Sequence, residues 1–110
     1  MVRLMFCVVV FGLSVAAPAV AQDARAAGEK LFTEQKCSLC HSIAGKGNVK
    51  GPLDEVGSKL KADEIRAWIT DAKAMTAKVK PERKPEMKAY DLPKGDVDAL
   101  VAYLTTLKKK

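Results

Sequence analysis

The amino-acid sequence predicts one all-α domain. Three segments repeat apolar residues at helical spacing, and none shows the alternation of a half-buried strand. Glycine and proline gather between these segments, where turns and loops are expected. A chain of 110 residues has room for one such domain.

The first expected helix covers residues 23–36, and Asp23 is placed to cap its start. The second covers residues 60–73. The last covers residues 94–110, with Asp96 near its start and lysines at its end, as the helix dipole favours. The apolar residues at helical spacing in these segments are Ala27, Leu31 and Phe32, then Ile65, Trp68 and Ile69, then Val97, Leu100, Val101, Leu104 and Leu107.

Two segments between the helices are expected to be irregular. Residues 37–57 hold several glycines and one proline, which predicts a loop with short turns. Residues 74–93 hold Pro81, Pro85 and Pro93 together with many lysines. Because proline interrupts helices, this segment is expected to be an irregular strap leading into the last helix.

The first 21 residues are typical of a secretory signal peptide. One basic residue precedes an apolar run, and the segment ends in Pro18 and the small-residue pattern A-x-A. Cleavage is expected after Ala21, which would remove Cys7 and leave a domain of residues 22–110. The alternative is a retained membrane anchor, but the apolar run is short for a membrane span.

Charge and size restrict the function further. The net charge is +6, so the domain is basic, and the leader predicts a periplasmic location. Nucleic acid is a poor candidate partner, because the leader predicts export and the chain has few aromatic residues for stacking. A domain this short buries only about 60–65% of its surface. Small exported domains therefore often rely on disulfides, a metal or a cofactor.

The segment "CSLCH", residues 37–41, carries the chemistry. A redox dithiol would need a βαβ context, which the pattern of elements lacks. A zinc site would need four ligands, but the chain has no second C-x-x-C and no other histidine. The remaining interpretation is covalent haem attachment, for which C-x-x-C-H is the known pattern. Cys37 and Cys40 would bond the porphyrin, and His41 would be an axial iron ligand.

The sequence resembles the small single-haem bacterial cytochromes c, a class I family with an N-terminal C-x-x-C-H motif. The resemblance covers residues 24–107 and rests on "AGEKLFTEQKCSLCHSIAGKG", "GPLDEVG", "IRAWI" and "MKAYDLPKGDVDALVAYLTTL". It implies a cytochrome c fold of three to four helices around one covalently bound haem c per chain. The first and last helices are then expected to cross, with Gly28 and Phe32 against Leu100 and Tyr103.

The second axial iron ligand is less tightly specified. Lysine, methionine or an open position are all chemically possible, and methionine suits an electron carrier because it raises the potential. The two methionines outside the leader are Met75 and Met87. The resemblance and the ligand preference together favour Met87, with Met75 as the alternative. Lys88 stands where the family often has proline, which favours a looser strap and leaves an open iron as the alternative.

The resemblance also implies contacts around the haem. The carbonyl of Pro52 would accept a hydrogen bond from the His41 ring, although "GP" is also an ordinary turn. Trp68 would bond a haem propionate through its indole, or simply pack on its helix face. Tyr90 is a weaker candidate for a propionate contact.

The expected function is electron transfer in a respiratory chain, not catalysis. The protein would be a soluble periplasmic monomer without stable membrane insertion after leader cleavage. Its many lysines would frame the exposed haem edge and steer acidic redox partners. Two alternatives are a haem subunit of a larger oxidoreductase and an open-iron sensor or peroxidase-like protein.

Overall fold

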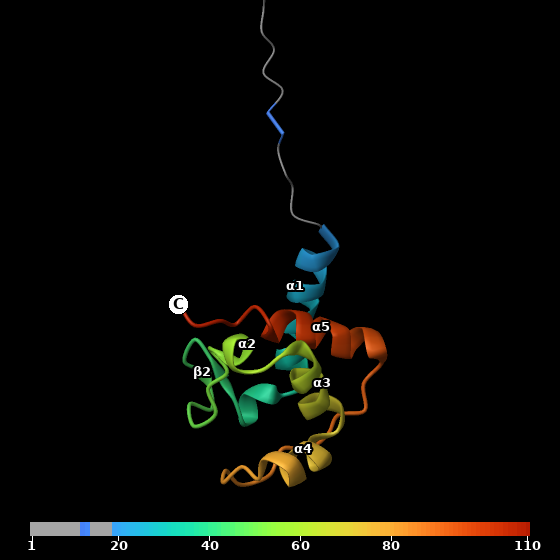
Figure 1. Ribbon diagram of the computed structural model, residues 1–110. Helices are drawn as coiled ribbons and strands as arrows, with labels where there is room; N and C mark the ends of the chain where they lie inside the picture. The colour runs from blue at the N-terminus through green and yellow to red at the C-terminus, as the bar shows by residue number, and fades with distance from the viewer. Residues whose placement is uncertain (1–11, 14–18) are drawn as a thin grey trace, which may run out of the picture.

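The computed structural model describes residues 12–13 and 19–110 and confirms the all-α prediction (Figure 1). The remaining residues, 1–11 and 14–18, belong to the predicted leader, whose assignment therefore stays a prediction. No helix among the described residues is long and apolar enough to span a membrane. In chain order the elements are α1 (Ala19–Glu34), a 3₁₀ turn η1 (Cys37–Leu39), β1 (Ser42–Ile43), β2 (Lys46–Gly47), α2 (Val56–Lys59), α3 (Ala62–Thr70), α4 (Ala72–Val79) and α5 (Lys94–Leu104).

The crossing of α1 and α5 forms the main contact of the fold, as predicted (Figure 1). The Phe32 ring meets the Tyr103 ring edge-on, with their centroids 6.3 Å apart. Gly28 is buried where a β-carbon would collide with the Ala99 carbonyl and the Tyr103 β-carbon. Ala27, predicted on the apolar face, is instead exposed. The contacting helices contribute to a core of Phe32, Ile65, Ile69, Val97, Leu100, Val101, Tyr103 and Leu104.

The close approach at Gly28 leads to a prediction about stability. Gly28→Ala should lower the free energy of unfolding by about 1–3 kcal/mol, because two packed helices must separate to admit the methyl group. Urea unfolding of the haem-loaded protein measures this. Gly95→Ala is the matched control: it is also in a helix, but a β-carbon there meets no atom within 4 Å. The control should be neutral or slightly stabilising, and equal stability of the two variants would contradict the packing argument.

Both terminal helices differ from their predicted limits. α1 begins at Ala19 because alanines continue the helix upstream, so Asp23 lies inside it and is not a cap. α5 ends at Leu104, so the C-terminal lysines do not lie in its last turn. The tail leaves α5 to bond α2: the Gly57 N–H donates to the Leu107 carbonyl at 2.7 Å.

The second predicted helix is divided, and the predicted strap is shorter than expected. α3 ends at Thr70 because Asp71 leaves the helical conformation, with φ −144° and ψ 51°, and α4 then runs to Val79. Placing residues 74–79 in the irregular strap was therefore wrong. This stretch is rich in alanine, lysine and methionine, which favour helix. α4 ends where Lys80 turns left-handed before Pro81, since the residue before proline disfavours helix.

An ion-pair network joins α3 to α5. The Asp98 carboxylate accepts from Arg66 Nη2 at 2.6 Å and from Lys94 Nζ at 2.9 Å. These hydrogen bonds lower the pKa of Asp98 below its ordinary value, and the bond from Lys94 has the larger effect, followed by the bond from Arg66. The network therefore favours the charged carboxylate in the folded state.

The sign of this effect gives a pH-dependent prediction. Because the pKa of Asp98 is lower in the folded state than in the unfolded state, its ionised carboxylate stabilises the fold at pH values above the ordinary pKa of aspartate. This stabilisation is lost as the pH falls through the folded-state pKa. Asp98→Asn should thus be less stable than the native protein near neutral pH and equally stable in strong acid. Urea unfolding across this range measures the difference. Asp91→Asn, at an exposed position, is the control, and a pH-independent difference for Asp98→Asn would refute the linkage.

Candidate functional site

The turn after α1 places the C-x-x-C-H segment. α1 stops where Lys36 adopts the left-handed conformation, with φ 57°, and the 3₁₀ turn η1 follows. The His41 N–H donates to the Cys37 carbonyl at 2.9 Å, which closes the segment into a compact turn. Both cysteines are free thiols, and Cys37 is half-buried while Cys40 is exposed. Burial raises the pKa of Cys37, and the neighbouring Cys40 raises it further, against the opposing effects of a backbone hydrogen bond and of Lys88.

A short β-ribbon, absent from the predicted elements, supports this turn. β1 and β2 pair antiparallel, with Ser42 opposite Gly47 and Ile43 opposite Lys46. The two residues between them, Ala44 and Gly45, both have positive φ, which is the geometry of a tight hairpin turn. The chain then continues through Asn48, whose side-chain amide donates to the Leu39 carbonyl at 3.1 Å. The ribbon thereby returns the chain to the C-x-x-C-H turn.

A single hydrogen bond orients the imidazole of His41. Its Nδ1 lies 3.1 Å from the Gly51 carbonyl oxygen. A carbonyl can only accept, so Nδ1 carries the proton and Nε2 is left free for a metal. Burial lowers the pKa of His41, the Gly51 bond opposes this, and the charge of Arg83 lowers it further. The side chain therefore favours its neutral form, which is the form that binds metals.

The acceptor is a correction to the sequence-based expectation, which gave this role to Pro52. The Gly51 carbonyl also accepts from the Ser42 N–H at 3.1 Å, so the backbone pairing of these segments turns that carbonyl toward His41. Pro52 bridges to Ser42 instead, is exposed, and does not line the cavity described next.

A cavity of about 490 Å³ opens beside the C-x-x-C-H turn. This volume lies within the about 300–1,000 Å³ typical of sites for small molecules and cofactors. The motif contributes Cys37, Cys40 and His41 to its wall. Apolar side chains from η1, from the loop after the ribbon, from in and after α2, and from α1, α3 and α5 complete much of the wall. They are Phe32, Leu39, Leu53, Val56, Leu60, Ile65, Ile69, Leu100 and Leu104.

The strap supplies another part of the wall and distinguishes the two methionines. Met87 lines the cavity and is half-buried. Met75 is also half-buried but lies in α4 and is not among the cavity-lining residues. The structure therefore brings Met87, and not Met75, to the same cavity as His41.

Trp68 and Tyr90 also border the cavity, and both are half-buried. Tyr90 is fixed by its backbone N–H, which donates to the Ile69 carbonyl at 2.8 Å. Lys88 Nζ lies 5.3 Å from the centre of the Tyr90 ring, within cation–π range. The hydrogen bonds of Trp68 and Tyr90 to a haem propionate remain predictions.

Sequence reasoning missed Arg83 as a cavity residue. It stands in the lysine-rich strap, where its charge resembles the many basic residues around it. Its residue type could have distinguished it from the lysines around it. Arg83 is the only arginine of the strap, and its planar guanidinium group makes contacts that a lysine ammonium cannot.

The cavity and its donors fit a covalently attached haem. Two free thiols stand one turn apart, the adjacent imidazole offers Nε2, and a thioether lies in the same wall. Most of the remaining wall is apolar, which suits a porphyrin. Within residues 12–13 and 19–110 no group of three or more His, Cys, Asp or Glu side chains is placed to hold a metal ion.

Comparisons with known proteins agree with this chemistry. The chain is 30% identical over 91 residues to cytochrome c oxidase subunit 2 of Alkalihalophilus pseudofirmus, a match covering 74% of this chain and 25% of that protein. The chain thus spans about a quarter of the length of that relative. No solved structure matches.

The family assignment rests on a broader match. The model of the cytochrome c family matches residues 25–108, most of the chain. Membership implies covalently bound haem c, haem-based electron transfer and redox partners. With the crossing of α1 and α5 and the C-x-x-C-H turn, this match shows that the chain belongs to the cytochrome c family, in its class I form.

Proposed function

We propose that this protein is a periplasmic electron carrier holding one haem c, with Cys37 and Cys40 as its attachment points and His41 and Met87 as axial ligands. The observation that carries the proposal is that all four side chains line one largely apolar cavity. Met87 comes from a segment far from the motif in sequence, so the fold itself brings the pair together. We favour retention of both ligands, because that suits electron transfer more than ligand binding.

Individual residues of the chain have separate roles in such a carrier. When bound, haem supplies an iron that alternates between Fe(II) and Fe(III). Gly51 fixes the ring orientation of His41 by accepting its Nδ1 proton. Ile65, Ile69 and Leu100 exclude water from the cavity, which keeps the surroundings apolar. Low polarity and the Met87 thioether both favour the less charged, reduced iron.

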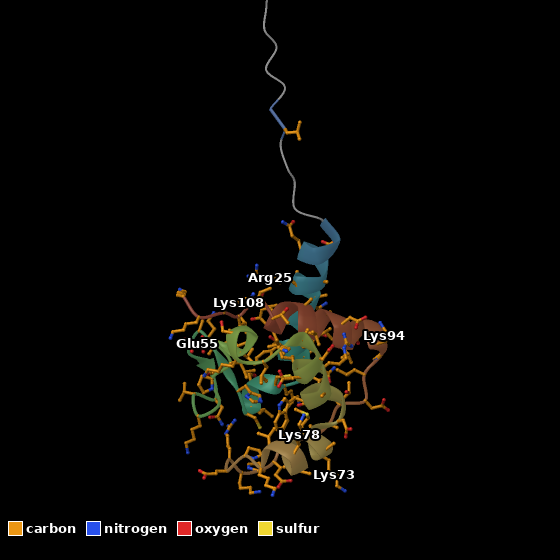
Figure 2. The ribbon with its side chains drawn as sticks, in the orientation of Figure 1. Arg25, Glu55, Lys73, Lys78, Lys94 and Lys108 are labelled. Carbon is orange, nitrogen blue, oxygen red and sulfur yellow. The ribbon has the colours of Figure 1, made fainter. Side chains whose placement is uncertain are left out.

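The surface suits an acidic redox partner. Lys36 and Lys88 border the cavity and are exposed. Further lysines such as Lys73, Lys94 and Lys108 lie around the outside of the molecule (Figure 2). A basic surface steers an acidic partner and makes the association rate fall as salt increases.

A second candidate is a haem subunit within a larger oxidoreductase. The similarity to part of a cytochrome c oxidase subunit 2 favours it, since the matched segment is a quarter of that longer protein. Co-purification separates the candidates: a free monomer that exchanges electrons with several partners supports the carrier, and a fixed complex supports the subunit.

The carrier proposal has a direct test. The protein is expressed where haem attachment to exported cytochromes operates, and the periplasmic fraction is purified. Its mass should equal residues 22–110 plus one haem, and a redox titration should give one reversible one-electron couple. The reduced protein should bind carbon monoxide only weakly, because both axial positions are filled. Rapid, tight binding would favour the open-iron sensor or peroxidase-like alternative.

A further inference from the structure

Arg83, in the strap, packs against the loop that follows the β-ribbon. A β-carbon added to Gly51 would collide with Nη1 of Arg83, and it would come within 2.8 Å of the guanidinium carbon. The guanidinium group therefore packs directly on Gly51. Gly51 is the residue whose carbonyl orients His41, and Arg83 belongs to the segment that carries Met87. One side chain thus joins the two segments that bear the candidate iron ligands.

The positive charge of Arg83 has no acidic partner within the described part of the chain. The neighbouring Lys84 differs, because its Nζ pairs with Glu86 at 2.8 Å. Arg83 lines the cavity as well. An uncompensated cation therefore stands beside the turn that holds the candidate ligand.

We propose that Arg83 raises the reduction potential of the bound iron by holding an unpaired positive charge against the His41 turn. The inference rests on the proposed electron-carrier function. Oxidised iron carries one more positive charge than reduced iron, so a nearby fixed cation disfavours the oxidised state. Arg83 is exposed to solvent, so salt screens this effect. The contribution is therefore largest at low ionic strength.

The experiment compares redox titrations of the haem-loaded native protein with three variants at low and at high salt. Arg83→Gln removes the charge and keeps a planar polar group. Arg83→Lys keeps the charge but not the guanidinium fork. Lys73→Gln is the charge-matched control, because Lys73 is exposed at the outer edge of α4 and does not line the cavity (Figure 2). The near-infrared sulfur-to-iron band of each oxidised protein reports whether the methionine ligand is retained.

At a fixed applied potential, the reduced-to-oxidised ratio should fall several-fold in Arg83→Gln at low salt, with the sulfur-to-iron band unchanged. The fall should shrink at high salt, and Arg83→Lys and Lys73→Gln should stay near the native ratio. An unchanged ratio in Arg83→Gln, or an equal fall in Lys73→Gln, would overturn the proposal. Loss of the sulfur-to-iron band in Arg83→Gln would also overturn it, since Arg83 would then act by holding the strap and its methionine ligand in place and not through its charge. A native protein without any reversible couple would instead defeat the electron-carrier function itself.

Discussion

Replacing both cysteines, in Cys37→Ala/Cys40→Ala, should abolish cooperative folding of the domain. Without covalent attachment the cavity of about 490 Å³ loses the group that we expect to fill it. The apolar wall that haem would cover is then left exposed to water or unpacked, which is unfavourable. The whole stability of a small domain is only about 5–15 kcal/mol. The chain should therefore collapse around the cavity or unfold.

Circular dichroism during urea titration measures this outcome. The double variant should show a shallow, non-cooperative change, whereas the native protein should show one sharp transition. Leu39→Ala is the control, because it alters the same turn at a side chain that is 70% exposed and leaves both thiols in place. A sharp transition in the haem-free double variant, with the native denaturant slope, would show that the fold does not depend on haem.

Met87→Ala should lower the reduction potential substantially and open the iron to added ligands. The thioether favours reduced iron, and axial ligands together set haem potentials over about 0.8 V. The alanine side chain cannot reach the iron, so water or an added ligand would take the position. A redox titration and carbon monoxide binding to the reduced protein measure the two effects.

The matched variant is Met75→Ala. Met75 is half-buried like Met87 but does not line the cavity, so its loss should affect stability and leave the potential nearly unchanged. If Met75→Ala lowers the potential while Met87→Ala does not, the ligand assignment is reversed. If neither variant changes it, methionine is not the sixth ligand.

The helical core could be predicted from the sequence because its signals are local. Phe32 on α1 and Leu100 and Tyr103 on α5 repeat at helical spacing, and all three are buried. α4 was missed because nearby prolines and lysines suggested an irregular strap, although its own residues favour helix until Pro81. The end of α5 was missed because it depends on a distant contact, the bond between Gly57 and Leu107.

The candidate site was predictable to the extent that it is a contiguous motif. Cys37, Cys40 and His41 were predicted from their spacing, together with the lack of a βαβ context for a dithiol and of further ligands for zinc. The acceptor for His41 is Gly51 instead of Pro52, because backbone pairing with Ser42 sets which carbonyl faces the ring. Arg83 could not be singled out from the sequence for the same reason, since its contact with Gly51 arises only in the folded chain. Such details arise from tertiary geometry that no local pattern encodes.

The near-infrared sulfur-to-iron band of the oxidised protein tests the central claim most directly. This band requires a thioether bound to ferric iron, so it reports the sixth ligand itself. The band should be present in the native protein and in Met75→Ala and absent from Met87→Ala. A band that survives in Met87→Ala and disappears in Met75→Ala, or that is missing from the native protein under all conditions of pH and temperature, would contradict His41 and Met87 as the axial pair.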